Sequence, residues 1–440
     1  MFPCGVASGD PTSSSVVLWT KVAGTAAGAD RTVAWEVSSG ERVIARGDAL
    51  ARADDDHTVH VDVTDLDPGE EYEYRFTVDG ATVVGRTRTL PAAADSLRFA
   101  VMCCHRWGWP GFDRAAAVAD ERPDVVLHLG DSIYEIGEVP PAGPATEPRW
   151  DCHTLADYRQ RYRQHRSHPA LRRLHADVPV IAVWDDHEVV DNAPDPAQAD
   201  RRRAGQRAWW EWTPMRRERD DASVNRFVTV DGLIDLALVD SRFSGRLPSQ
   251  VDGPGDPGDG AGHLLAPDQW RLLDEFVRGA DAPWLAVANQ VQVGPTTLTP
   301  RPALAWPPWR RVVNPDQWDG YPGDRDRLFH LLDQSTGDAV VLSGDLHSAW
   351  SRTLSHHRKH VGHEFTSPSI SGSTFAEAVR GTVPLPTSVL TAWLRLINRG
   401  VDHLDLDRHG YVVCDVTPER LVTTFVMHDG ERHEISLSHR

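Results

Sequence analysis

The sequence predicts an all-β domain followed by a larger α/β domain, and two hydrophobic patterns support this organisation. Up to about residue 90, short alternating segments recur about every ten residues with turn residues between them, which is typical of a β-sandwich. From residue 97 onward, continuous apolar runs alternate with helical stretches, which indicates buried strands in a layered α/β domain. At 440 residues the chain is also too long for one ordinary core.

Six segments of the N-terminal region are predicted to form the strands of the sandwich. They span residues 15–22, 31–39, 42–49, 57–66, 71–80 and 81–90. The segment LDPGEEYEYRF, residues 66–76, resembles the corner of a fibronectin type III domain, where a Pro-Gly turn precedes a strand whose tyrosine packs back over it. With PAAADS (91–96) as a linker, we predict domains at residues 1–92 and 97–440.

The second region is predicted to contain six buried strands and at least four helices. The strands are expected at residues 97–103, 124–130, 179–184, 233–239, 283–289 and 339–344. The helices are expected at residues 111–121, 155–165, 268–279 and 326–335. The Gly- and Pro-rich segment 248–262 cannot continue either kind of element and is predicted to be an exposed loop.

Composition excludes several classes of protein. The net charge of −18 argues against a general nucleic-acid or anionic-membrane surface, because phosphate groups are bound mainly by clustered Lys and Arg. No apolar run approaches the roughly 20 residues of a membrane span. Five cysteines are too few and too scattered for a disulfide scaffold. A phosphate substrate would therefore need local positive charge, which a metal cluster can provide.

Residues whose side chains can bind a metal or take part in catalysis stand at the ends of five of the predicted strands. In an open α/β sheet, ligands bind beyond the carboxyl ends of the strands, so these residues form one site if the strands are neighbours. They are Cys104, Asp131, Tyr134, Asp186, His187, Asn289, Asp345 and His347.

The side chains of this set divide by ligand chemistry. Oxygen-only ligands suit a hard cation such as calcium, magnesium or manganese; these are Asp186, Asn289 and Asp345. Thiolate, phenolate and imidazole suit a transition metal; these come from Cys104, Tyr134 and His347. Asp131 could bridge the two. Trivalent iron beside calcium would explain the mixture, and zinc fits less well because phenolate is not among its usual ligands.

Each of these residues also has a structural interpretation. Cys104 could be a small buried hydrophobe, Tyr134 a packing aromatic, and Asp131 a helix cap. Asp240 and Arg242 are interpreted as a buried structural ion pair instead of a phosphate clamp. The tryptophans of residues 304–321 are expected to pack a lid or rim.

Ordered motifs now indicate a family. They are FPCGVASGDPTSSSVVLWTKV, FAVMCCH, GDSIYE, VWDDHEVVDN, LALVDSRF, ANQ, SGDLHSAW and EFTSPSISGS. In this order and over almost the whole chain they resemble the PhoD-type alkaline phosphatases, a branch of the calcineurin-like metallophosphatase superfamily. The resemblance implies a PhoD-type N-terminal domain before a catalytic αββα sandwich.

The resemblance also implies ligands and roles. Iron would be bound by Cys104, Asp131, Tyr134 and His347, and calcium by Asp131, Asp186, Asn289 and Asp345, with Mn²⁺, Mg²⁺ or Zn²⁺ as alternatives. His187 would stand close to the leaving group. The chain has Cys103 and His105 where the family usually has Ser and Gln, so His105 is a candidate additional ligand or phosphate contact.

The implied activity is hydrolysis of small phosphate esters. At a dinuclear or trinuclear Fe/Ca centre, a metal-activated hydroxide would attack phosphorus, with Asp131 and His187 as the catalytic residues. Phospholipase D-like cleavage of diesters is an alternative, and a non-catalytic binding protein is another. The chain as written has no export signal at its N-terminus and is expected to be cytoplasmic; export through the twin-arginine route is the alternative, since the family commonly uses it.

Overall fold

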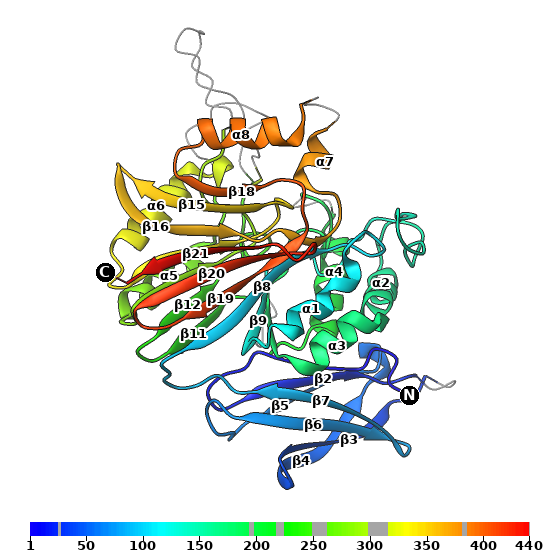
Figure 1. Cartoon of the computed structure of the whole chain (residues 1–440). Helices are drawn as coiled ribbons and strands as arrows, with labels where there is room; N and C mark the ends of the chain where they lie inside the picture. The colour runs from blue at the N-terminus through cyan, green and yellow to red at the C-terminus, as the bar shows by residue number, and fades with distance from the viewer. Residues whose placement is uncertain are drawn as a thin grey trace.

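Two stacked β-sheets form the centre of the molecule, with helices on both outer faces. The computed structural model describes residues 1–24, 28–192, 198–216, 224–248, 262–297, 316–380 and 385–439. Figure 1 shows α1, α2, α3 and α4 gathered on one side of the strands, with α5 and α6 at the other side. The α/β class predicted from the sequence is confirmed.

The first sheet has ten strands in the order β21-β20-β19-β8-β9-β10-β1-β2-β5, with β17 paired to β8. In chain order these strands are Val6–Gly9 (β1), Val16–Lys21 (β2), Thr58–Val63 (β5), Leu97–His105 (β8), Val125–His128 (β9), Val180–Ala182 (β10), Ser369–Ser371 (β17), Gly410–Val416 (β19), Arg420–Met427 (β20) and Arg432–Ser438 (β21). Strands β8, β9 and β10 run parallel to one another. Their carboxyl ends therefore lie along one edge.

The second sheet has seven strands in the order β11-β12-β13-β14-β16-β15-β18. They span Arg226–Val230 (β11), Ile234–Leu238 (β12), Trp284–Ala288 (β13), Asp338–Ser343 (β14), Ala349–His356 (β15), Lys359–Thr366 (β16) and Val401–Asp405 (β18). Side chains such as Val101 and Leu127 of the first sheet share one buried core with Ala286 and Leu342 of the second. The layered sandwich is thus closed by apolar contact between the sheets.

The helices cover the two outer faces. On the first sheet these are Ala115–Asp120 (α1), Leu155–Ser167 (α2), Pro169–Asp177 (α3) and Ala199–Trp212 (α4). On the second sheet lie Pro267–Gly279 (α5) and Pro322–Asp333 (α6), whose residues Leu273 and Leu328 join Val287 and Val341 in a separate core. Two further helices, Phe375–Val379 (α7) and Thr387–Ile397 (α8), pack with β18.

The N-terminal region is an all-β sandwich whose second layer continues into the first sheet. Strands β3 (Arg31–Ser39), β4 (Arg42–Ala51), β6 (Glu71–Val78) and β7 (Ala81–Arg88) form a four-stranded sheet that packs on β1, β2 and β5. The predicted tyrosine corner is present, because the Tyr72 hydroxyl accepts a hydrogen bond from the backbone N–H of Asp67 at 2.9 Å.

Strand β1, which the sequence patterns did not predict, joins the two regions. It pairs in parallel with β10 at Gly9 and Val180. A Cβ on Gly9 would lie 2.3 Å from the carbonyl oxygen of Pro214, so only glycine allows this approach. Because backbone pairing crosses between the regions, the division at residues 92–97 remains a prediction.

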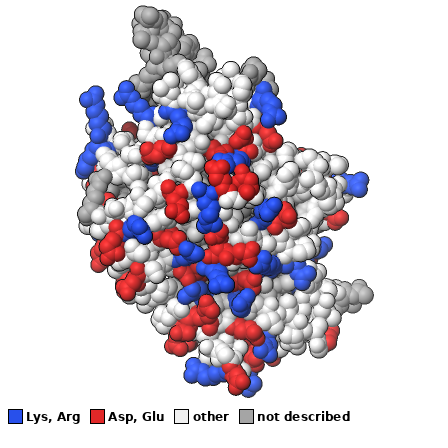
Figure 2. Space-filling model, viewed as in Figure 1, with Lys and Arg blue, Asp and Glu red and all other residues white. Residues whose placement is uncertain are grey.

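The distribution of charge on the surface agrees with the expectation, from the net charge, of no large basic area. Acidic and basic side chains are interspersed over the face shown in Figure 2, without a large continuous blue area. Among the described residues, no helix is long and apolar enough to cross a membrane. Most of the predicted loop 248–262 and of the predicted rim segment 300–320 lies outside the described residues. Trp318, which is described, is fully buried.

Buried histidines lie between the first sheet and its helices. His128 ends β9, His165 lies on α2, and His175 lies on α3. Burial lowers the pKa of His128 from 6.5 to about 4, and it lowers the pKa values of His165 and His175 well below the ordinary value. These imidazoles are therefore neutral at pH 7.

We predict that His128 makes folding sensitive to acid. The unfolded chain binds this proton near pH 6.5 and the folded chain only near pH 4, so the stabilisation is complete above pH 6.5 and is lost between 6.5 and 4. The loss amounts to roughly 3 kcal/mol. Urea unfolding at pH 7 and pH 5 should show this dependence reduced in His128→Asn, whose amide oxygen can still accept from Gly130. The exposed His330→Asn is the control, and equal pH dependence in both variants would contradict the prediction.

Candidate metal centre

The predicted site residues meet where the edges of the two sheets come together. Cys104 is the last residue but one of β8, and Asp131 and Tyr134 follow β9. Asp186 and His187 follow β10, while Asp345 and His347 follow β14 of the second sheet. Adjacent parallel strands in the first sheet bring the first five residues to one edge, and the sandwich packing adds the last two.

The backbone is unusual at these positions. Cys104, Asp131, Asp345 and His347 have φ values of 55°, 55°, 67° and 49°, in the left-handed region that residues other than glycine seldom adopt. Such conformations persist only where the surroundings enforce them, and they gather at functional sites. The Cys104 N–H donates to the Gly130 carbonyl at 3.1 Å, and the His105 N–H donates to the Asp131 carbonyl at 2.8 Å. These bonds hold the two strand ends together.

One cluster combines sulfur, oxygen and nitrogen ligands. Side-chain ligand atoms of Cys104, Asp131 and His347 lie within 4.8 Å of one another. The Tyr134 hydroxyl donates to Asp131 Oδ2 at 2.9 Å and lies 3.0 Å from His347 Nε2. His347 Nδ1 is 2.6 Å from the Ser373 carbonyl oxygen, so Nδ1 carries the proton and leaves the Nε2 lone pair for the cluster.

A second cluster contains carboxylates. Ligand atoms of Asp185, Asp186 and Asp345 lie within 4.8 Å of one another, as do those of Asp131, Asp186 and His187. Asp131 and Asp186 thus connect the two clusters. Asp185 was not predicted from the sequence, although it stands beside Asp186 in WDDHE; two consecutive carboxylates after a buried strand were the available signal.

Within the described ranges, three buried carboxylate oxygens of these clusters accept no hydrogen bond. They are Asp131 Oδ1, Asp185 Oδ2 and Asp186 Oδ1. A buried, unpaired carboxylate oxygen is costly, and cations are the partners that satisfy several such oxygens at once. The residues present therefore fit a metal centre.

Arg242 supplies the positive charge inside the carboxylate cluster. Its guanidinium is fully buried, bonds to Asp185 and Asp316, and donates to Asp345 Oδ1 at 2.7 Å. Its Nη2 also lies 3.7 Å from Asp186 Oδ1. The predicted ion pair between Arg242 and Asp240 is wrong, because Asp240 accepts from the indole of Trp184 and from backbone N–H groups, including that of Arg242.

Asn289 lies at the end of β13 with its oxygen engaged. Its Oδ1 accepts from the indole N–H of Trp318 at 2.9 Å and from the backbone N–H of Val291 at 3.2 Å. The amide oxygen is thus already engaged, and the role of Asn289 as a ligand remains a prediction.

His187 stands at the accessible side of the clusters. Its side chain is 14% exposed, and its Nδ1 lies 2.7 Å from Glu135 Oε2. Its ring lies 4.3 Å from the ring of Tyr134. Burial alone would lower the pKa of His187, but Asp131, Asp186 and Glu135 outweigh it and raise the pKa well above 6.5. Glu135 therefore orients the ring with Nε2 directed away from it.

The pKa values of the other acidic groups in the clusters reflect burial and the closeness of several carboxylates. Burial, reinforced by neighbouring carboxylates, raises the pKa of Asp131 well above its ordinary range, and burial likewise raises that of Cys104. Burial raises the pKa of Asp345 to about 6 against the opposing charge of Arg242. For Asp186, Arg242 and His187 overcome the effect of burial and lower the pKa to about 2. A cation would favour the anionic forms, so metal binding should release protons.

His105 faces away from the clusters, whereas the Cys103 thiol lies between the sheets beside the Cys104 thiol and Gly344. The left-handed backbone at Cys104 interrupts the alternation of β8, so its two neighbours point to different surroundings. His105 Nε2 lies 2.9 Å from the Phe112 carbonyl oxygen, and Cys103 Sγ lies 3.7 Å from that of Pro368. The hypothesis that His105 is a further ligand or phosphate contact finds no support in this position.

Comparisons with known proteins agree with this geometry. A family described as PhoD-like phosphatase matches residues 99–425, and its N-terminal domain matches residues 1–91. The chain belongs to the PhoD-like phosphatase family. Alkaline phosphatase D of Bacillus subtilis (strain 168) is 31% identical over 95% of this chain and 76% of that protein. A solved structure titled "Structure of PhoD" superposes with a TM-score of 0.85 at 28% identity, over 99% of this chain and 89% of that one.

Membership of the PhoD-like phosphatases makes this chain a phosphoric ester hydrolase. The interpretation as a non-catalytic binding protein is thereby set aside. The fold class also agrees with the family, including the all-β N-terminal domain.

We predict that Arg242→Met lowers the free energy of unfolding of this PhoD-like phosphatase, because the folded state needs a positive charge in the carboxylate cluster. Removing the guanidinium leaves Asp185 and Asp345 buried without a cation, which should cost about 3–5 kcal/mol in the presence of chelator. Added Ca²⁺ should recover part of the loss. Urea unfolding with and without Ca²⁺ measures both effects.

The matched control is Arg278→Met, which removes an exposed arginine paired with Asp274 on α5 and should change little in either condition. An Arg242→Met loss as small as that of the control would contradict the proposed charge balance.

Proposed function

We propose that this chain hydrolyses small phosphate esters at a centre that contains Fe³⁺ and Ca²⁺. The supporting observation is the pair of linked clusters, in which a thiol and a phenol lie near carboxylate oxygens of Asp131 and Asp186 that accept no hydrogen bond among the described residues. Thiolate and phenolate favour a trivalent transition metal, and carboxylates favour a hard divalent ion. Mn²⁺, Mg²⁺ and Zn²⁺ are the alternatives.

The ligand assignment follows the two clusters. Iron would be held by Cys104, Asp131, Tyr134 and His347. Calcium would be held by Asp131, Asp186, Asp345 and Asn289, although Asn289 would first have to release its bond from Trp318. When bound, the two ions would supply Lewis acidity that neutralises phosphoryl charge and lowers the pKa of water.

The chain's own residues would handle protons and orientation. His187 lies at the accessible side, and its Nε2 can donate a proton to the departing alkoxide. Glu135 accepts from Nδ1 and fixes the ring in that orientation. Glu188 accepts from the backbone N–H groups of Asp131, Ser132 and Asp185, so it holds the loops after β9 and β10 in register with each other.

The substrate class is proposed to be phosphate monoesters, with diesters as the alternative. Substrate size and charge are sensed by the rim of such a site. Residues 252–263 and 300–320 are our candidates for this rim, and most of both segments lies outside the described residues. The preference for monoesters follows the similarity to alkaline phosphatase D.

We expect exhaustive chelation to abolish hydrolysis of p-nitrophenyl phosphate, and reconstitution with Fe³⁺ and Ca²⁺ together to restore it better than either ion alone. Elemental analysis of the purified protein gives the metal content independently of activity. Full activity in metal-free protein would overturn the mechanism. Faster hydrolysis of bis-p-nitrophenyl phosphate than of the monoester would instead overturn only the monoester preference.

We predict that His187→Asn lowers kcat by roughly 10²–10⁴-fold, because general acid catalysis typically contributes that much. KM should change little, since the ligand clusters remain. The effect should be smaller for a substrate whose leaving group needs no protonation, such as p-nitrophenyl phosphate, than for an alkyl phosphate. The exposed His153→Asn is the control, and an equal loss on both substrates would contradict the role of proton donor.

A further inference from the structure

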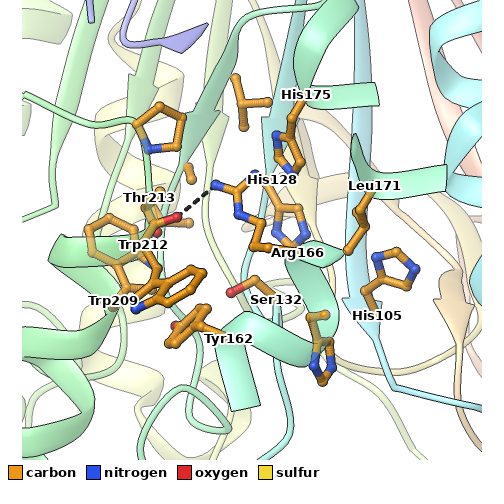
Figure 3. A pocket seen from close by; sticks show the side chains of 15 residues that line it. His105, His128, Ser132, Tyr162, Arg166, Leu171, His175, Trp209, Trp212 and Thr213 are labelled. Atoms are coloured by element: carbon orange, nitrogen blue, oxygen red, sulfur yellow. Dashed lines mark hydrogen bonds between the residues drawn. The ribbon is translucent and has the colours of Figure 1, made fainter. Parts of the chain in front are cut away.

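A small cavity lies behind the metal centre, on the outer face of the first sheet. Its volume is about 40 Å³, which is enough for a few water molecules. Its walls come from β9, β10, α2, α3 and the end of α4. Figure 3 shows Arg166 at its centre beside His128, with His175 and His105 around them.

Arg166 is a buried cation that has no anionic partner in the described part of the chain. Its side chain is nine-tenths buried, and its guanidinium makes one hydrogen bond among the described residues, to the Trp212 carbonyl at 2.7 Å. It also stacks over Trp19 at 4.9 Å, which offsets part of the cost of burial. Burial lowers its pKa to about 10, so it remains charged at neutral pH.

Other buried arginines of the chain are compensated. Arg242 contacts several aspartates, and Arg352 lies 3.8 Å from Glu364. Arg161, one and a half turns before Arg166 on α2, donates to four carbonyl oxygens. A buried charge normally needs such partners, so the cavity beside Arg166 is where a compensating group would sit.

The cavity walls add donors without adding charge. His128 Nδ1 accepts from the Gly130 N–H at 3.3 Å, so its proton is on Nε2, which is free to donate. His175 Nδ1 is buried without a partner. The lowered pKa values keep both imidazoles neutral. The described residues of the walls therefore carry one positive charge, and none of them is a carboxylate.

We propose that this cavity binds a small monovalent anion, of which chloride is the representative, through the Arg166 guanidinium and the His128 Nε2–H. One guanidinium balances one negative charge, whereas a phosphate dianion would need a second cation. The small volume also favours a halide, because chloride is only slightly larger than water.

The location suggests what the anion does. His128 ends the strand that leads to Asp131, and His105 directly follows Cys104 on β8. An anion bound between Arg166 and His128 would link α2 and α3, through hydrogen bonds, to the strands whose ends carry the predicted ligands. It would stabilise the folded chain without contacting substrate.

The first experiment compares the metal-loaded protein in sodium chloride and in sodium gluconate at constant ionic strength. Gluconate is too large for the cavity, so the comparison isolates binding from screening. Chloride should give a saturable rise in Tm of about 2–4 °C, and bromide should act similarly.

The matched variants are Arg166→Met and Arg163→Met. The first removes the buried charge and should abolish the halide dependence. The second removes an exposed arginine of the same helix that pairs with Asp56 and should retain it. Halide dependence that persists in Arg166→Met would overturn the assignment.

The second experiment needs only the wild-type protein and holds even where Arg166→Met does not fold. Crystals soaked in bromide should show an anomalous peak within hydrogen-bonding distance of the Arg166 guanidinium. Water alone in the cavity, with equal Tm in chloride and gluconate, would overturn the proposal. Stabilisation by inorganic phosphate but not by halide would equally overturn the monovalent assignment.

Discussion

Mutual repulsion of carboxylates in a water-poor interior is the constraint on which the site depends. Asp131, Asp185, Asp186 and Asp345 approach one another closely enough to share ligands, and Arg242 contributes one buried positive charge against them. The compensation is incomplete, since three carboxylate oxygens of these residues accept no hydrogen bond from the described part of the chain. This deficit favours binding of cations. Burial is the main reason why the pKa values of Asp131 and Asp345 are raised, and the neighbouring carboxylates add to it.

The two-sheet architecture makes that concentration of charge possible. Strands β8, β9 and β10 bring their carboxyl ends together in one sheet, and β14 brings Asp345 and His347 from the other. Hydrophobic contact between the sheets supplies the stability that offsets the strained φ values at Cys104, Asp131 and Asp345. The same sheet has a second role on its outer face, where Arg166 and the neutral histidines line a cavity of opposite charge. The same strands thus carry the negatively charged carboxylate cluster at their ends and the positively charged Arg166 cavity on their outer face.

Local pattern predicted the elements that have strong periodicity or continuous burial. The predicted strand 31–39 matches β3, and the predicted helix 268–279 differs from α5 by one residue. Strand β1 was missed because it has only four residues, all buried, and therefore shows no alternation. The pairing of Asp240 with Arg242 was predicted from their closeness in sequence. In the folded chain, Asp240 accepts hydrogen bonds from backbone N–H groups. The Arg242 guanidinium instead donates to Asp185, Asp316 and Asp345.

By itself, the sequence determined the ligand types and their positions after strands, since Gly-Asp following an apolar run is a local feature that chain order alone displays. It also determined the family, through motifs that occur in order. Only the tertiary structure decided which residues share a cluster, because Asp185, Arg242 and Asp345 are far apart in sequence and meet through sheet packing. It likewise decided that His105 points away from Cys104, because the left-handed backbone at Cys104 interrupts the alternation of the strand. Helix docking, finally, leaves Arg166 without a carboxylate beside it among the described residues.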